Sequence, residues 1–152
     1  MTLISHFLAD DHHRCDNLFA EVEAAVSALK WEEAQLHFGL FREALEHHFT
    51  MEEQVLFTSF EEKTGMTGGP TAVMRREHDQ MRDLTQMMQL DLDNQDDSSY
   101  LGHSEVLNIM MAQHNLKEEN VLYQMCDQVL RSEAPRLVDS MKELVDIVNV
   151  HY

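Results

Sequence analysis

HFTMEEQVLF, residues 48 to 57, and HNLKEENVLY, residues 114 to 123, are two nearly identical decapeptides that decide how this chain folds. Each begins with His-x-x-x-Glu, a spacing that places both side chains on one face of a helix, about 6 Å apart. Each decapeptide histidine also follows another histidine by 36 residues, His48 after His12 and His114 after His78. The duplicated frame therefore offers four imidazoles and two carboxylates: His12, His48, Glu52, His78, His114 and Glu118.

Apolar residues recur every three or four positions along most of the chain, which is the spacing of amphipathic helices packed in a bundle. Four seams of this kind are present, and the six candidate residues all lie within them. A polar side chain in such a seam is costly unless it has a partner. The seams are Leu8, His12, Cys15, Phe19, Val22, Val26 and Leu29; Phe41, Leu45, His48, Glu52, Val55 and Ser59; Met74, His78, Met81, Thr85, Met88 and Leu92; and Leu107, Met111, His114, Glu118, Val121 and Met125.

Three breaks divide the chain into helices. EEKTGMTGGP, residues 61 to 70, ends with a proline that suits a first helical turn, DNQDDSS at 93 to 99 is a polar turn, and Pro135 starts a short final helix. An antiparallel hairpin aligns residues that are equidistant from its turn, and the midpoints of the two histidine pairs are residues 30 and 96. Turns at Lys30 and Asp96 therefore place all four histidines at one level of a bundle.

The sequence predicts an all-α fold, an up-down-up-down four-helix bundle with a short extra C-terminal helix. The 152 residues suit a single domain over 1–152. The expected helices span roughly 3–29, 32–62, 70–92, 100–131 and 135–150. The last helix is expected to cap the bundle or to form a homodimer face through Leu137, Met141, Leu144, Val145 and Val148.

Charge and composition exclude several classes of partner. Eleven Lys and Arg against 28 Asp and Glu give a net charge of −17, whereas binding to nucleic acid or anionic lipid needs clustered positive charge. No apolar run approaches the roughly 18 residues of a membrane span, and the first residues lack the basic flank and apolar core of a signal peptide. Two cysteines fit a reducing compartment. We therefore expect a cytoplasmic protein that binds neither nucleic acid nor membrane.

Four imidazoles and two carboxylates at the centre of a bundle form a ligand set for two divalent ions, best iron, with manganese or zinc as alternatives. A zinc protease is disfavoured because no H-E-x-x-H occurs, and the E-x-x-H order of ferritin-like di-iron proteins is inverted here. An open coordination position would permit reaction with a small molecule. In the expected arrangement, one ion is held by His12 and His48, the other by His78 and His114, and both are bridged by Glu52 and Glu118.

The whole chain resembles the hemerythrin-like HHE cation-binding family. LADDHHRCDNLF, HHFTMEEQVLF, REHDQMRDL and QHNLKEENVLY are similar to its four ligand helices. The resemblance implies two non-haem iron ions with an oxo or hydroxo bridge. It also implies His12 rather than His13 and His48 rather than His47, as the seams do. The implied ligands are His12, His48, Glu52, His78, His114 and Glu118.

The third helix separates two groups within this resemblance. Oxygen-carrying hemerythrins have two histidines four residues apart there, but Met74 and Arg82 occupy the positions four from His78. A single histidine resembles the di-iron proteins for Repair of Iron Centres, which respond to nitric oxide and oxidative damage. We therefore expect binding or reduction of nitric oxide, oxygen or peroxide in stress, with an unknown redox partner. The alternatives are oxygen or iron binding, storage or sensing without turnover, and a structural bundle with a vestigial site.

Other polar residues receive structural interpretations. His37 and His103 each precede a ligand histidine by 11 residues, about three helical turns. With Glu23 they are expected to form a polar bundle end, and a second metal layer is the alternative. The glutamates next to ligands are expected to face solvent, with hydrogen bonds to ligand imidazoles as the alternative; they are Glu53, Glu77 and Glu119.

Tyr123 and Phe57 are equivalent in the repeat and are expected to pack, although only Tyr123 offers a hydroxyl. Cys15 is expected to be an inert thiol in an apolar seam. The helix directions place Cys15 and Cys126 about 22 Å apart along the bundle, too far for a disulfide.

Overall fold

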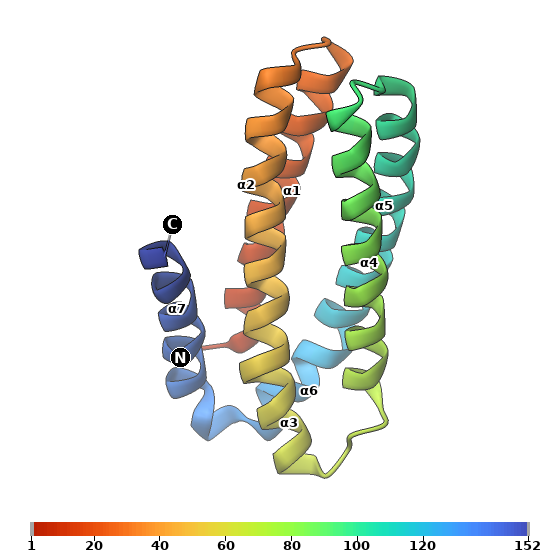
Figure 1. The fold of residues 1–152 in the computed structure, drawn as a ribbon. Helices are drawn as coiled ribbons and strands as arrows, with labels where there is room; N and C mark the ends of the chain where they lie inside the picture. The colour runs from red at the N-terminus through yellow and green to blue at the C-terminus, as the bar shows by residue number, and fades with distance from the viewer. Residues whose placement is uncertain (1, 152) are drawn as a thin grey trace.

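The computed structural model describes the backbone of residues 2–151 and the side chains of residues 2–144. Four helical segments run antiparallel to their neighbours, and a fifth lies against the outside of the bundle (Figure 1). The expected all-α bundle with an extra C-terminal helix is confirmed. The elements are α1 Ile4–Ser27; α2 Trp31–Thr50, continued by η1 Met51–Leu56 and α3 Phe57–Thr64; α4 Pro70–Asp93; α5 Asp97–Lys117, continued by η2 Glu118–Leu122 and α6 Tyr123–Val129; the 3-10 turn η3 Arg131–Glu133; and α7 Ala134–His151.

The α1–α2 and α4–α5 turns have the same construction, at residues 28–30 and 94–96. Leu29 and Gln95 have φ angles of 57° and 51°. The residue after each donates its amide to the helix carbonyl five residues earlier, at 2.9 Å in both turns. This paired bond is a Schellman-type helix end. Leu29 therefore lies in a turn and is 57% exposed, so its expected place in the first seam is wrong.

Two π-helical segments, η1 and η2, change which residues face the core after Glu52 and Glu118. A π-turn contains about one residue more than an α-turn, so the face rotates along the sequence. Of the residues expected in the seams there, Val121 is 54% exposed, and Val55, Ser59 and Met125 are only half-buried. The two seams are thus corrected, and the buried residues are Leu56, Phe57 and Phe60 after Glu52, and Leu122, Tyr123 and Cys126 after Glu118.

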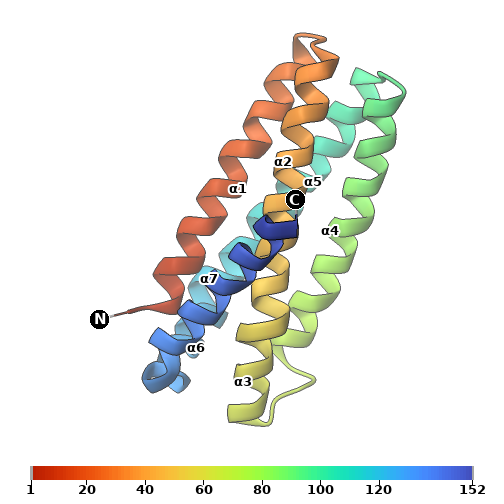
Figure 2. The ribbon, with the colours of Figure 1, turned by 60° about the vertical axis from the view of Figure 1, so that its left-hand side comes forward.

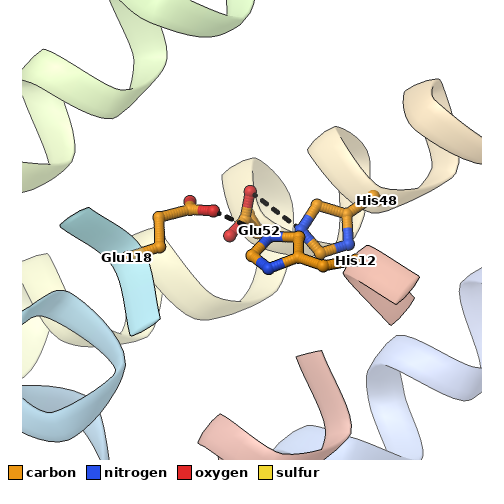
Figure 3. A group of neighbouring side chains, drawn as sticks. All are labelled: His12, His48, Glu52 and Glu118. Carbon is orange, nitrogen blue, oxygen red and sulfur yellow. Dashed lines mark hydrogen bonds and ion pairs between the residues drawn. The ribbon is translucent and has the colours of Figure 1, made fainter. Parts of the chain in front are cut away.

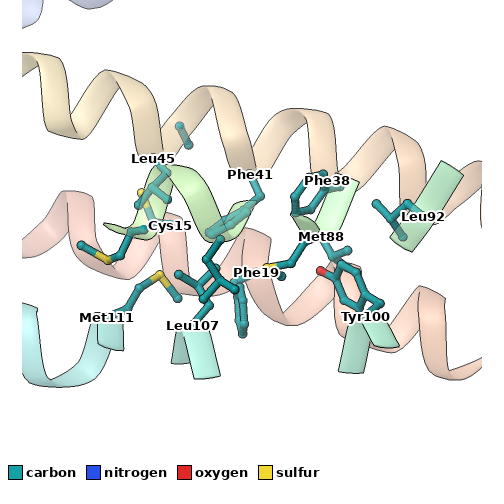
Figure 4. Packing of buried hydrophobic residues seen from close by; sticks show 14 of the residues in the cluster. Cys15, Phe19, Phe38, Phe41, Leu45, Met88, Leu92, Tyr100, Leu107 and Met111 are labelled. Carbon is teal, nitrogen blue, oxygen red and sulfur yellow. The ribbon is translucent and has the colours of Figure 1, made fainter. Parts of the chain in front are cut away.

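The apolar core consists of two clusters with the level of the candidate ligands between them. The cluster on the side of the α1–α2 turn is rich in aromatic rings, including Phe19, Phe41 and Tyr100 (Figure 4). The other cluster lies toward the opposite end of the bundle. Cys15 and Cys126 belong to different clusters, and both are buried free thiols, as expected.

The last helix, α7, packs against α1 and η1 along the side of the bundle (Figure 2). Leu137 and Met141 are 2% and 0% exposed and join the second apolar cluster. Because α7 lies along the side of the bundle, it does not cap the end. Leu137 and Met141 are covered within this chain, so these two side chains are not offered to a second copy. Val145 and Val148 lie outside the described side chains. None of the described helices has the length and hydropathy needed to cross a bilayer.

Candidate metal centre

The six residues singled out by spacing lie together in one buried layer. They form two groups of four that share Glu52 and Glu118, and within each group one ligand-type atom per residue lies within 4.8 Å of all the others. Figure 3 shows the first group, in which side chains from α1, α2, η1 and η2 converge. The exposed fraction of every member is 4% or less. The two groups are His12, His48, Glu52 and Glu118, and Glu52, His78, His114 and Glu118.

We call the two groups the first and second halves of the layer, and the shared Glu52 and Glu118 its inner carboxylates. Each inner carboxylate faces one imidazole from each half. The Nε2 atoms of His48 and His78 lie 3.5 Å and 3.0 Å from Oε1 of Glu52. Glu118 stands in the same relation to the other two rings, with His12 Nε2 at 3.1 Å from Oε1 and His114 Nε2 at 3.2 Å from Oε2. The arrangement is that of two carboxylates placed between two pairs of nitrogens.

A second carboxylate lies at the outer nitrogen of every imidazole. The Nδ1–oxygen distances are 2.7 Å for His12 with Glu119, 2.8 Å for His48 with Asp11, 2.7 Å for His78 with Glu53 and 2.7 Å for His114 with Glu77. An ionised carboxylate only accepts hydrogen bonds, so each Nδ1 carries the proton. In a neutral ring the Nε2 lone pair then points into the layer, which is the form that binds metals.

These contacts correct the expectation that Glu53, Glu77 and Glu119 face solvent. Their side chains are 20% to 39% exposed, yet each binds a histidine. Asp11 was not anticipated at all. A signal was present, because Asp11 and Glu77 each directly precede a histidine that is a candidate ligand, and the two contacts they make both span 37 residues. The duplication therefore extends to the acids beside the ligands.

Cations hold three of these four outer carboxylates. Arg14 donates to Asp11 at 2.8 Å, Arg82 donates to Glu53 at 2.9 Å, and Lys117 donates to Glu77. Burial opposes ionisation of Glu53, but hydrogen bonds from His78 and Arg82 outweigh it and lower its pKa. Among the described side chains, no Lys or Arg pairs with Glu119, which is also the most exposed of the four, at 39%.

Charge compensation within the layer shifts the pKa of its members. Burial opposes protonation of His78, but the carboxylates of Glu52 and Glu53, one beside each ring nitrogen, raise its pKa to about 9. The pKa of His48 is also raised well above its usual value, against burial, by Glu52 and Asp11. Burial disfavours the ionised form of Glu52, yet the charge of His48 holds its pKa well below its usual value. Without a metal, the layer thus holds protons that a metal ion would replace.

Tyr123 places a hydroxyl in the first half of the layer. Its oxygen donates to Glu52 Oε2 at 2.6 Å, and it lies 3.0 Å from Glu118 Oε1. Burial and these two carboxylates raise its pKa well above the usual value, so the phenol is neutral. Its equivalent, Phe57, stacks on His78 in the second half, with ring centroids 5.7 Å apart. Both rings pack, as expected, but only one half of the layer contains a hydroxyl.

The second half contains four buried ligand-type atoms that fit a metal ion. Glu52 Oε1, His78 Nε2, His114 Nε2 and Glu118 Oε2 are buried. They face one another in pairs at 3.0 Å and 3.2 Å, but none makes a hydrogen bond of acceptable geometry with a described residue. Buried polar atoms are nearly always satisfied, so four such atoms converging on one point require an explanation. Imidazole nitrogen and carboxylate oxygen are ligands that suit iron, manganese and zinc, and the residues present therefore fit a metal ion.

Other histidines lie outside this layer. His13 is exposed, and His47 is buried but belongs to neither group of ligand atoms. His37 contacts Glu21 at 3.3 Å, and His103 contacts Asp91 at 2.6 Å. Glu23 instead accepts a hydrogen bond from Ser104. Within residues 2–144, no group of possible metal ligands includes these residues, which favours the polar bundle end over a second metal layer.

Two hollows reach the layer from the surface. One, of about 100 Å³, lies between α4 and α5 and is lined by Glu77, Met81, Met110 and His114 among others. The other, of about 510 Å³, lies between α1 and α5, and His12 and Glu119 contribute to its lining. Each half of the layer is therefore approached by a different route.

Comparison with known protein families matches residues 3–126 to the hemerythrin HHE cation-binding domain. The matched span includes all six residues of the layer. No curated protein and no solved structure was found to match.

Proposed function

Because the chain belongs to the hemerythrin HHE cation-binding domain family, we propose that its buried layer binds two iron ions. The proposal rests on the two groups of four converging ligand-type atoms, and in the second group none of these atoms makes a hydrogen bond of acceptable geometry. The inner nitrogens of the four rings face the two shared glutamates, and the outer nitrogens are fixed by carboxylates. In this proposal His12 and His48 bind one ion, His78 and His114 bind the other, and Glu52 and Glu118 bridge them.

We further propose that the loaded centre binds or reduces a small molecule, either nitric oxide, oxygen or peroxide. Bound iron would supply a redox-active Lewis acid for such ligands. The chain supplies a dry layer, since the inner glutamates are 0% exposed. The α4–α5 hollow supplies a narrow approach, partly walled by Met81 and Met110, that favours a ligand of a few atoms.

A role in nitrosative or oxidative stress, such as that of the Repair of Iron Centres proteins, is the form of this function we favour. The third helix supports it because neither residue four positions from His78 supplies a ligand. Met74 is buried in apolar core, and Arg82 pairs with Glu46 and Glu53. With one imidazole fewer than an oxygen carrier, the centre retains more room for reaction. The second candidate function is oxygen or iron binding, storage or sensing without turnover. The same enclosed layer favours it if no electron donor binds to the protein, because turnover would need a reductant.

The setting of this function is also proposed. A net charge of −17 disfavours nucleic acid and anionic membranes as partners. We propose a cytoplasmic location and an unidentified redox partner that would return the iron to its ferrous state.

Metal analysis tests the proposal directly. Protein purified anaerobically after iron-replete growth is expected to contain about two irons per chain and to develop oxo-bridge absorption in air. His48→Ala should lose iron. His47→Ala should not, because the His47 ring is buried but lies outside the layer. One zinc, or no metal, in the unmodified protein would overturn the proposal. Consumption of nitric oxide or peroxide would identify the stress function, and reversible oxygenation without consumption of reductant the binding function.

A further inference from the structure

The two halves of the layer differ at one position of the duplicated decapeptides, Tyr123 in one and Phe57 in the other. Both rings are 0% exposed, and each directly follows a π-helical segment that contains Glu52 or Glu118. The chain therefore places aromatic rings equivalently in the two halves but adds an oxygen atom to only one of them. The four histidines and two glutamates of the layer show no such difference between the halves.

The Tyr123 oxygen lies among the atoms that would share the first metal ion. Glu52 Oε2 is 2.6 Å away, Glu118 Oε1 is 3.0 Å away, and the Nε2 atoms of His12 and His48 are 3.2 Å and 3.3 Å away. One atom from each of the four residues thus surrounds the hydroxyl at hydrogen-bond distance. In the second half, the equivalent atoms surround no hydroxyl, and none of them makes a hydrogen bond of acceptable geometry.

The ring has little freedom to leave this position. It stacks against His12 with centroids 5.7 Å apart and an interplanar angle of 23°, and it belongs to a buried cluster with its neighbours Leu122 and Cys126. Protein interiors are close-packed, so a buried ring moves only if its surroundings repack. An ion that contracts the four ligand atoms to bond lengths of about 2.0–2.2 Å would therefore meet the phenol oxygen as a further neighbour.

We propose that the Tyr123 hydroxyl oxygen is itself a ligand of the iron bound by His12 and His48, so that the two iron positions are chemically unequal. As the oxygen–iron bond forms, the phenol O–H bond breaks and its proton leaves to solvent, and no electron is transferred in this step. The inference rests on the proposed di-iron function and adds a seventh protein ligand to it.

The inequality assigns different tasks to the two positions. The first position has five protein donors, two nitrogens and three oxygens, whereas the second has four. The exchangeable small ligand therefore binds at the His78–His114 position, whose approach is the α4–α5 hollow that His114 helps to line. In the alternative role, Tyr123 only donates a hydrogen bond that orients Glu52. Both iron positions then have four protein ligands, and no iron–phenolate bond is expected.

Iron-loaded protein oxidised to the ferric state distinguishes these two roles. We expect a visible phenolate-to-iron charge-transfer band and, on excitation within it, resonance-Raman bands of a coordinated tyrosinate ring. Tyr123→Phe should abolish both signals from the iron that remains bound, with each signal expressed per iron measured in that variant. The equivalent position already contains Phe57, so the fold accepts this side chain. Tyr100→Phe is the matched control, since Tyr100 is equally buried but lies in the other apolar cluster, and it should leave both signals unchanged.

The outcomes separate this inference from the proposed function. Two irons without tyrosinate bands in the unmodified protein, or with bands that persist in Tyr123→Phe, would overturn the ligand role and leave the di-iron function standing. Failure of the unmodified protein to bind two irons would overturn the proposed function, and the ligand role with it. Circular dichroism of each variant confirms that a lost band does not reflect unfolding.

Discussion

Glu53 lies 2.7 Å from the Nδ1 atom of His78, and its chain neighbour Glu52 lies 3.0 Å from the Nε2 atom of the same ring. Two consecutive glutamates thus contact opposite sides of one imidazole that belongs to another helix. Glu118 and Glu119 hold His12 in the same way. The second glutamate of each Glu-Glu pair therefore fixes the orientation of a ring that the first glutamate faces.

Glu53→Gln tests this orientation. The amide keeps the shape but loses the charge that favours a protonated Nδ1, and loss of such a partner typically costs about 10–100-fold in metal affinity. Competition with a chromophoric chelator measures the change. Glu46→Gln is the control, because Glu46 also pairs with Arg82 but contacts no histidine. Equal affinities for the two variants would show that Glu53 has no such role.

Phe41→Ala tests the aromatic cluster on the α1–α2 turn side of the candidate metal layer. Phe41 is 0% exposed and packs edge to face against Phe19, with centroids 5.2 Å apart. Truncation leaves a cavity and should lower the free energy of unfolding by about 3–5 kcal/mol. Leu40→Ala, at an adjacent residue that is 45% exposed, should change it by less than about 0.5 kcal/mol. Urea denaturation of metal-free protein gives both values, and similar losses would contradict the burial pattern.

Metal removal should lower the melting temperature. A metal that binds only the folded chain, at 100 times its dissociation constant, adds about 2.7 kcal/mol per site, which corresponds to about 5–11 °C in a chain of this size. Calorimetry before and after chelation, with anaerobic ferrous iron restored afterwards, measures the shift. Calcium should not replace iron, because it prefers oxygen ligands. An unchanged melting temperature in protein shown to be loaded would argue against binding in the buried layer.

The thiol of Cys15 should be unreactive in the folded protein. Burial, the largest cause, raises its pKa to about 11, so at pH 8 only about one thiol in a thousand is ionised, and the thiolate is the reactive form. The raised pKa lowers the thiolate fraction at any given pH. Below that pKa the thiolate fraction rises about tenfold per pH unit, so the alkylation rate should rise by the same factor until the fold is lost. Mass spectrometry after iodoacetamide treatment, native and in urea, tests this. Rapid native labelling at pH 8 would be inconsistent with the buried position.

Met110→Trp should narrow the α4–α5 hollow, because Met110 forms part of its lining. We expect slower binding of nitric oxide or oxygen to the iron-loaded protein, with unchanged iron content, measured by stopped-flow absorption. Ile109→Trp is the control, since this neighbour is 51% exposed and does not line the hollow. Identical rates for both variants would indicate that the small molecule enters by another route, such as the α1–α5 hollow.

The sequence by itself determined the bundle and the layer. Helical periodicity and turn residues are local properties, so they identified the two hairpins, Pro70 as the first residue of α4 and the turns near residues 30 and 96. The repeated 36-residue interval then placed His12 level with His48, and His78 level with His114. The six residues singled out by their spacing are those that the fold brings together.

Only the tertiary structure decided what surrounds that layer. Contacts between helices depend on how each helix is rotated about its axis, and a single π-turn changes that rotation by about one residue. This is why Val121 faces outward while Tyr123 reaches the ligands, and why a uniform seam failed beyond Glu52 and Glu118. The outer carboxylates depend on the same rotation, since Asp11 and His48 are 37 residues apart and meet only when α1 and α2 present these faces to each other.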